Sequence, residues 1–219
     1  MTGRFIAVDG PSGVGKTTVT SLLADLVAAE GHRVHQTKEP TRTRLGETAR
    51  YGTDDYHGLT LACLVTADRY HHLETEVRPA LAAGKVVLCD RYLATSLVLQ
   101  RMDGVDGDFV WALNRYTNRP DLTIILTGDP TRSRTRAAAR GIHSRFHRGG
   151  PEAGRRERER YDQVAVELAE AGFTVHLHEV GEQKPEEVAA ELLIRVRLLL
   201  AGTGSGQTPT DRAARISES

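Results

Sequence analysis

The stretch Gly10-Pro11-Ser12-Gly13-Val14-Gly15-Lys16-Thr17 decides the fold of this chain. It follows the apolar run Phe5–Val8 and precedes residues 16–29, where apolar side chains recur at helical spacing. The pattern G-x-x-x-x-G-K-[ST] between a strand and a helix is typical of a loop that wraps a triphosphate. Its glycines let successive backbone N–H groups turn toward phosphate oxygens, and the helix N-terminus adds favourable partial charge. The stretch therefore predicts an α/β fold that binds ATP.

The chemistry of this loop assigns a task to each residue. The expected ATP-binding residues are Gly10, Ser12, Gly13, Val14, Gly15, Lys16, Thr17 and Thr18. Lys16 is expected to reach the β- and γ-phosphates, and the Thr17 hydroxyl to ligate Mg²⁺. Asp90 is the expected second metal ligand, because it follows a buried strand at the carboxyl edge where open α/β sheets bind ligands. A local capping role for Asp90 is the alternative.

Apolar runs and helical patterns alternate along the rest of the chain. Strands are expected at residues 5–8, 33–37, 85–89, 122–126 and 173–177. Helices are expected at residues 16–29, 59–83, 94–100, 108–117, 130–140, 155–171 and 185–200, with Pro79 bending the second. This order predicts a three-layer α/β/α fold around a five-stranded parallel sheet.

The length and composition limit the possible domain organisation and partners of the chain. Its 219 residues suit one domain, expected over residues 1–201, and residues 202–219 have the polar composition of a disordered tail. The 29 basic and 29 acidic residues balance, so the net charge favours neither a polymeric nucleic acid nor a membrane as partner. Cys63 and Cys89 lack metal or redox spacing and are expected to be buried, reduced thiols. With no signal-peptide pattern, a cytoplasmic location is expected.

Ten arginines fall between Arg132 and Arg160. A loop is expected over residues 141–154, centred on Gly149-Gly150-Pro151. Arg155, Arg156, Arg158 and Arg160 alternate with Glu157 and Glu159, a pattern that favours a solvated helix face. The nine histidines lie on different expected elements and are assigned structural or solvent-facing roles rather than a metal site.

Several further motifs, in this order and spacing, resemble the thymidylate kinases among the nucleoside monophosphate kinases. They are Lys38-Glu39-Pro40-Thr41-Arg42-Thr43, Ala67-Asp68-Arg69, Asp90-Arg91-Tyr92, Arg119-Pro120-Asp121-Leu122-Thr123 and Arg136…Arg140-Gly141. The resemblance runs from about Phe5 to Leu200. It implies a P-loop kinase with a mobile lid, over about residues 141–156, and a homodimer in which helix 59–83 is the candidate interface.

The resemblance also implies roles for single residues. Arg42 and Arg91 would hold the 5′-phosphate of the acceptor, and Arg69 would reach its base or phosphate. Arg136 would pack against the adenine of ATP, with Arg140 on the same side. Arg145, and Arg148 beside it, would close over the transferring phosphoryl group, giving a catalytic set of Lys16, Asp90, Arg91 and Arg145. The implied acceptor-side residues are Asp9, Glu39, Arg42, Val65, Arg69, Arg91 and Leu97.

The chain departs from the family pattern mainly on the acceptor side. Val65 stands where a phenylalanine commonly stacks on thymine, and Leu97 and Leu99 stand where an amide and a tyrosine are common. Ser12 replaces a frequent carboxylate for the sugar hydroxyl, and Ser144 and His147 replace acidic lid residues. A register shift, or substitution by Tyr70 or Tyr92, is one explanation; an acceptor other than ordinary thymidylate is the other.

The sequence as a whole predicts an ATP- and Mg²⁺-dependent kinase of a pyrimidine nucleoside monophosphate such as dTMP. A kinase of a modified nucleotide or of a nucleoside is the alternative within the same chemistry. A catalytically silent ATP-binding regulator is the alternative of another class, although Lys16 and Asp90 are both intact. A GTP switch is disfavoured, because Leu126-Thr127-Gly128-Asp129 supplies no guanine-reading motif.

Overall fold

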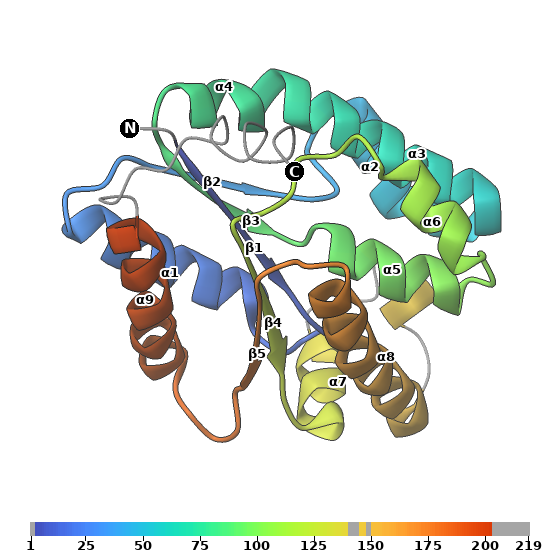
Figure 1. Cartoon of the computed structure of the whole chain (residues 1–219). Coiled ribbons are helices and arrows are strands. Elements are labelled where there is room, and N and C mark those ends of the chain that lie inside the picture. Colours follow the sequence, from blue (N-terminus) through green and yellow to red (C-terminus); the bar gives the residue numbers. More distant parts are fainter. Residues whose placement is uncertain (1–2, 140–144, 148–149, 203–219) are drawn as a thin grey trace, which may run out of the picture.

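The computed structural model of the chain describes residues 3–139, 145–147 and 150–202. A five-stranded parallel sheet in the order β2-β3-β1-β4-β5 forms its centre, with helices on both faces (Figure 1). The strands are β1 (Arg4–Asp9), β2 (Val34–Lys38), β3 (Val86–Asp90), β4 (Leu122–Thr127) and β5 (Val175–Glu179). The predicted α/β class and five-stranded parallel sheet are confirmed.

Helices α1 (Lys16–Ala29) and α9 (Pro185–Ala201) pack together on one face of the sheet. The helices on the other side are α3 (Gly58–His72), α4 (Arg78–Ala82), α5 (Leu93–Met102), α6 (Gly107–Leu113) and α8 (Pro151–Glu170). Two shorter helices, α2 (Arg44–Tyr51) and α7 (Pro130–Ala139), pack on α3 and α8. The bounds of α1 agree with the sequence prediction because its apolar residues Val19, Leu23 and Val27 recur every fourth position and are all buried.

The strand register brings the polar strand ends to one edge of the sheet. Val8 of β1 lies opposite Asp90 of β3, which in turn lies opposite Lys38 of β2. Asp9 ends β1 opposite Ile125 of β4. In an open parallel sheet, ligands bind in the crevice beyond these carboxyl ends.

Several elements differ from the sequence prediction: α6 ends at Leu113 and not at residue 117, and β5 is shifted by two residues from the predicted 173–177. Helix α2 was not predicted, although Thr43 caps it by accepting a hydrogen bond from the Gly46 N–H at 3.2 Å. Helix α8 begins at Pro151 and not at Arg155, since proline is favoured in the first helical turn and Glu152 complements the helix dipole there. Residues 151–154 of the expected loop are therefore helical, while residues 140–144 and 148–149 lie outside the described part of the chain.

The long helix predicted over residues 59–83 is continuous but irregular. A π-helical turn over Leu73–Val77 separates α3 from α4, and Pro79 lies in the first turn of α4. Proline has no N–H to donate, and its ring crowds the preceding turn of a helix. The π-helical turn before Pro79 is wider than an α-helical turn and so accommodates the missing hydrogen bond and the ring.

The two cysteines differ in exposure. Cys89 is buried as predicted, but Cys63 is exposed on α3, so the prediction of a buried thiol is wrong there. Within the described residues, none of the helices combines the length and the apolar character that crossing a membrane requires.

Helix α9 provides a direct test of the core on the α1 side. Leu192 is fully buried there, whereas Ile194 on the same helix is 55% exposed. We expect Leu192→Ala to lower the free energy of unfolding by about 2–5 kcal/mol, because it leaves a cavity, and Ile194→Ala to change it by less than about 1 kcal/mol. Urea denaturation of both variants measures this; equal losses would contradict the packing.

Candidate functional site

The loop after β1 forms a cradle of backbone. Gly13 has a φ of 83°, and a Cβ there would overlap the carbonyl oxygen of Ser133 on α7. Gly15 has a φ of 112° and no atom within 4 Å of the place where a Cβ would stand. In the described chain no side chain caps the N-terminus of α1, which begins directly after Gly15. The first N–H groups of α1, those of Thr17 and Thr18 among them, therefore suit an anion such as a phosphate.

Lys16 lies folded over this loop. Its Nζ donates to the carbonyl oxygens of Gly10 and Pro11, each at 2.7 Å, and the side chain is 4% exposed. Burial, together with the charge of Arg91, lowers the pKa of Lys16 to about 7. A bound polyphosphate would oppose both effects, because a nearby anion favours the charged ammonium.

Thr17 and Asp90 meet at the edge of the loop. The Thr17 hydroxyl donates to Asp90 Oδ2 at 2.6 Å, while Asp90 Oδ1 is buried and without a hydrogen-bond partner in the described residues. A hydroxyl and a carboxylate are the hard oxygen ligands that Mg²⁺ prefers beside phosphates. The pair predicted from sequence as metal ligands is therefore brought together with chemistry that fits the ion.

Asp9 connects β1 to the start of α5. Its Oδ1 accepts from the Tyr92 N–H at 2.9 Å, the Thr95 N–H at 2.9 Å and the Thr95 hydroxyl at 2.5 Å. Burial raises the pKa of the Asp9 carboxyl group. Asp9 is fully buried and fixes the turn that carries Arg91, so its contacts in the structure are to α5 rather than to an open cavity.

A cavity lies between the loop and helices α2, α3 and α5. Of the residues predicted on the acceptor side, Glu39, Val65, Arg69 and Arg91 line it, as does Ser12 of the loop. Among the lining residues that the sequence prediction missed are Arg50, Thr53, Ser96, Gln100 and Phe146. A mostly apolar lining with a few polar groups is typical of a site for a small organic ligand.

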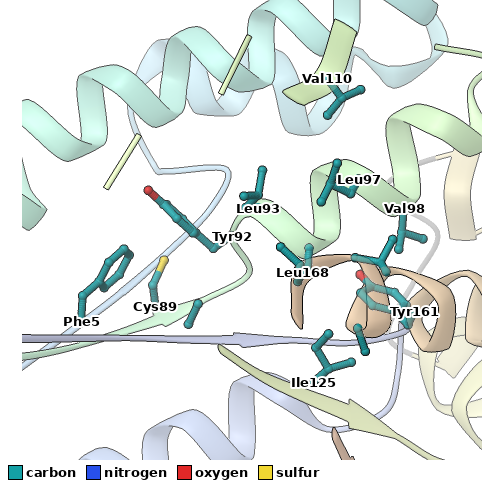
Figure 2. Close-up of a cluster of buried hydrophobic side chains, with 14 of the residues drawn as sticks. Phe5, Cys89, Tyr92, Leu93, Leu97, Val98, Val110, Ile125, Tyr161 and Leu168 are labelled. Atoms are coloured by element: carbon teal, nitrogen blue, oxygen red, sulfur yellow. The ribbon is translucent and has the colours of Figure 1, made fainter. Parts of the chain in front are cut away.

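The side of α5 that faces the cavity differs from the predicted one. Leu97 is fully buried in the apolar cluster beside the sheet, where Figure 2 draws it on the same helix as Leu93. Ser96 and Gln100 line the cavity instead, four residues apart on one helix face. The amide of Gln100 is 4% exposed, and its Oε1 has no hydrogen-bond partner within the described chain. An amide thus does face the cavity, one helical turn beyond Ser96, and the prediction for Leu97 is corrected.

Arg69 is held by a buried network. Its guanidinium donates to Glu39 Oε2 at 2.7 Å, to Asn114 Oδ1 at 2.6 Å and to Ser96 Oγ at 2.9 Å, and lies over the ring of Tyr92. Arg69 is 1% exposed. It forms part of the cavity wall, and its main contacts fix the positions of its neighbours.

Glu39, His72 and Cys89 bring three potential metal ligands together below this wall. The Glu39 carboxylate already bonds His72 Nδ1 at 3.1 Å and the Arg69 guanidinium, and Thr37 bonds His72 Nε2 at 2.8 Å. Burial raises the pKa of the Cys89 thiol well above its usual value. A paired carboxylate, a neutral thiol and an adjacent cation do not suit a metal ion, and the cluster is a hydrogen-bond network.

Cationic side chains gather beyond the ends of β2 and β3. Lys38 and Arg42 line a cleft together with Thr17 and Asp90. Burial, then the charges of Arg50 and Arg42, lower the pKa of Lys38. Burial and the charge of Arg91 likewise lower the pKa of Arg50. Mutually repelling cations at one place are stabilised by a multivalent anion, such as a phosphate.

The arginines predicted in and near the lid occupy different environments. Arg136 is exposed on α7, and Arg140 and Arg148 lie outside the described residues. Arg145 forms an ion pair with Asp103 at the end of α5, and its guanidinium donates to the carbonyl oxygens of Thr53 and Tyr56. This conformation holds Arg145 at the wall of the cavity, so the catalytic position predicted for it, over the phosphate loop, is not the one observed.

Glu157 departs from the solvated face predicted for α8, on which Arg155, Arg156 and Arg160 are exposed as expected. Its carboxylate is 2% exposed, and Oε1 accepts from the Ser12 N–H at 3.0 Å and the Ser12 hydroxyl at 3.2 Å. Arg158 next to it pairs with Glu179 and with Asp162. Helical phase explains the difference, since Glu157 lies one turn before the buried Tyr161 and faces inward with it.

Comparisons with known proteins give a consistent result. A sequence model of the family described as thymidylate kinase matches residues 8–191. The chain is 37% identical over 214 residues to a thymidylate kinase of Clavibacter sepedonicus, covering 94% of this chain and 100% of that protein. It is 34% identical over 202 residues to a thymidylate kinase of Exiguobacterium sibiricum, covering 88% and 95%. It is 38% identical over 154 residues to a probable thymidylate kinase of Pyrococcus abyssi, covering 67% and 75%.

The bond between Glu157 and Ser12 predicts a measurable loss of stability. Glu157→Ala leaves the buried N–H of Ser12 without an acceptor, so we expect the free energy of unfolding to fall by about 1–3 kcal/mol. Glu159→Ala is the matched control, because Glu159 is exposed two residues further along the same helix. Thermal and urea unfolding of both variants measure the difference. Indistinguishable stabilities would contradict the assigned contact.

Proposed function

Because the chain belongs to the thymidylate kinase family, we propose that it transfers the γ-phosphoryl group of ATP to the 5′-phosphate of a pyrimidine nucleoside monophosphate such as dTMP. Family membership makes the chain a phosphotransferase; the identity of donor and acceptor is the proposal. The observation that carries it is the cavity beside the phosphate loop, because Ser12 and Arg91 belong to the wall of that cavity and adjoin the loop.

The donor side is supported by the loop and its cations. The N–H groups at the start of α1 and the ammonium of Lys16 would hold the phosphates of ATP, and Thr17 with Asp90 would hold Mg²⁺. When bound, the ion neutralises charge on the phosphate oxygens. Arg136 and Arg140 remain proposed contacts of the adenine side, by resemblance alone.

The acceptor side is supported by the composition of the cavity. Its apolar part, with Leu61, Val65 and Leu99, suits the flat face of a base. None of the described residues donates to the Oε1 of Gln100, and the imide N–H of thymine or uracil would supply a donor. Arg91 lies at the loop end of the same cavity, and its Nη1 is buried without a partner among the described residues. A phosphate oxygen is the natural acceptor for that group.

Transfer would follow from positioning and charge. An oxygen of the acceptor phosphate, held by Arg91 and Arg42, attacks the γ-phosphorus; a new P–O bond forms, the bond to the β–γ bridging oxygen breaks, and ADP leaves. The attacking oxygen is already anionic, so no general base is needed. Lys16 and Arg91 would stabilise the charge on the oxygens during transfer.

Val65 keeps a second acceptor class open. A valine offers no aromatic face, which supports a modified nucleotide or a nucleoside as the alternative substrate.

A further proposal concerns assembly. Leu59 is 57% exposed and Cys63, one turn along α3, is exposed too, and this face is the candidate contact of a homodimer.

A panel of acceptors tests the proposal. With ATP and Mg²⁺, we expect turnover of pyrimidine nucleoside monophosphates, highest for dTMP, in an assay that couples ADP release to a reporter. Lys16→Ala should reduce turnover with every acceptor by at least about 10²–10³-fold, because it removes a donor to the transferring group. Lys85→Ala, in the connector before β3, is the control and should leave turnover unchanged. Turnover of nucleosides alone, or of none of the panel, would contradict the proposal.

The lowered pKa of Lys16 predicts a proton-coupled donor step. At pH 8 this amine is mostly neutral in the free protein, and bound phosphates favour its charged form. Binding of ATP at pH 8 should therefore take up close to one proton, and much less at pH 6. Calorimetry in buffers of different ionisation enthalpy measures the uptake. The Lys16→Arg variant, charged at both pH values, should show none, and buffer-independent heats for the unaltered protein at pH 8 would contradict the prediction.

A further inference from the structure

We propose that Phe146 is a substrate-binding residue of the acceptor site, whose ring covers one face of the acceptor's base, and that the ion pair between Arg145 and Asp103 positions it there. The inference rests on the proposed function, because it assumes that the cavity holds the base of a nucleotide. It assigns a substrate-recognition role to a segment between α7 and α8 in which sequence alone suggests only arginines acting on phosphate.

The position of Phe146 is the first observation. Its short helical segment, Arg145–His147, is far from α3 and α5 in sequence, yet Phe146 lines the cavity together with Val65 and Leu99 from those two helices. Tyr92 also lines the cavity, but its ring is 1% exposed and its hydroxyl donates to the Asn118 carbonyl oxygen at 2.8 Å. Of the two aromatic rings in the described lining, Phe146 is thus the one whose residue is more than slightly exposed.

The second observation is the set of contacts that fixes this segment. The Arg145 N–H donates to Thr53 Oγ1 at 3.2 Å, and its guanidinium pairs with Asp103 and donates to the Tyr56 carbonyl oxygen at 2.8 Å. On the other side, Arg134 of α7 donates to the carbonyl oxygen of Phe146 at 3.0 Å. The segment is therefore held to the cavity wall through Arg145 and to α7 through the carbonyl oxygen of Phe146.

Asp103 connects this segment to the wall of the cavity. Its carboxylate accepts from the Gly58 N–H at 2.6 Å, at the start of α3, and pairs with Arg145. Both partners of the ion pair are mostly buried, with side-chain exposures of 17% and 13%. The Arg145 guanidinium also lies 4.7 Å from the centre of the Phe146 ring. Neutralising Asp103 is thus expected to release the segment that carries the ring.

The chemistry of a base explains what the ring adds. Leu61, Val65 and Leu99 offer aliphatic contact but no π-face, and stacking on an aromatic ring adds substantially to the binding of a base. Stacking recognises a flat aromatic ring of either pyrimidine type and does not read its edge. Phe146 should therefore increase affinity for any acceptor that carries a base, while leaving the sugar phosphate and ATP unaffected.

The test compares Phe146→Ala with the unaltered protein in steady-state kinetics. We expect the KM for dTMP to rise by about 5- to 150-fold, the range that loss of one stacked base implies, with the KM for ATP unchanged. Phe146→Tyr should restore the KM for dTMP to within about threefold, because it keeps the ring. Tyr116→Ala, which removes an aromatic ring that is 69% exposed on the surface, is the matched control and should have no effect.

A ligand without a base separates recognition from a general structural defect. The inhibition constant of 2-deoxyribose 5-phosphate against dTMP should be the same for Phe146→Ala and the unaltered protein. A variant with a collapsed cavity would lose affinity for both ligands. Asp103→Asn keeps an acceptor for Gly58 but removes the charge that pairs with Arg145. It should raise the KM for dTMP in the unaltered protein and have little further effect in Phe146→Ala.

The outcomes distinguish this inference from the proposed function. If the unaltered protein phosphorylates dTMP and Phe146→Ala leaves the KM for dTMP within twofold, the inference fails and the proposed function stands. Equal weakening of dTMP and 2-deoxyribose 5-phosphate also overturns it. If the unaltered protein phosphorylates no nucleotide, the proposed function fails and the inference fails with it.

Discussion

The carboxylate of Asp9 receives three hydrogen bonds from the first turn of α5, and the rest of the site depends on this attachment. Asp9 ends β1, directly before the phosphate loop, and the turn it holds carries Arg91 after β3. Backbone pairing reinforces the link, because the Arg91 N–H donates to the Val8 carbonyl oxygen at 2.9 Å. One buried acid thereby fixes the distance between the loop and the arginine that faces the acceptor cavity. Its raised pKa reflects the cost of that burial, which the three donors partly offset.

The electrostatics of the site follow from crowding like charges at a buried edge. Burial first, and then the charges of neighbouring cations, lower the pKa values of Lys16, Arg50 and Lys38. The acids Asp90 and Glu157 oppose this effect at Lys16 without cancelling it. Such a site is least stable when its cations have no anion between them. Binding two phosphorylated ligands relieves the repulsion, so the same charges that weaken the ligand-free site favour the loaded one.

Local patterns in the sequence predicted what local physics determines. The glycine spacing and the apolar repeat located the phosphate loop and the bounds of α1, and the strand ends predicted that Thr17 and Asp90 meet. Failures occurred where a long-range contact decides. Glu157 sits among arginines and resembles a solvated residue, and only its bond to Ser12, 145 positions away in sequence, reveals a buried role. Arg145 likewise takes its position from Asp103, which no spacing rule connects to it.

Helical phase accounts for the error on α5. Leu97 and Gln100 are three residues apart, which is a rotation of about 60° around the helix axis. This rotation is enough to place Leu97 with Leu93 in the apolar cluster and Gln100 with Ser96 in the lining of the cavity. The sequence indicated that a polar contact with the base of the acceptor is lost, whereas the structure places the amide of Gln100 in the lining of the cavity. The chemistry of an acceptor pocket cannot be judged from one aligned position, since helix residues less than one turn apart can face different environments.

The acceptor cavity is built from segments that are distant in sequence, and this bears on how its specificity can change. The loop, α2, α3, α5 and the Arg145–His147 segment each contribute side chains to it. An apolar contact absent from one segment can be supplied by another, provided that the second is fixed in position. Val65 on α3 offers no aromatic ring, whereas Phe146 does. The ion pair and the hydrogen bond that hold the segment of Phe146 involve neither Val65 nor the phosphate loop. The donor loop has no such freedom, because its backbone geometry is itself the binding surface.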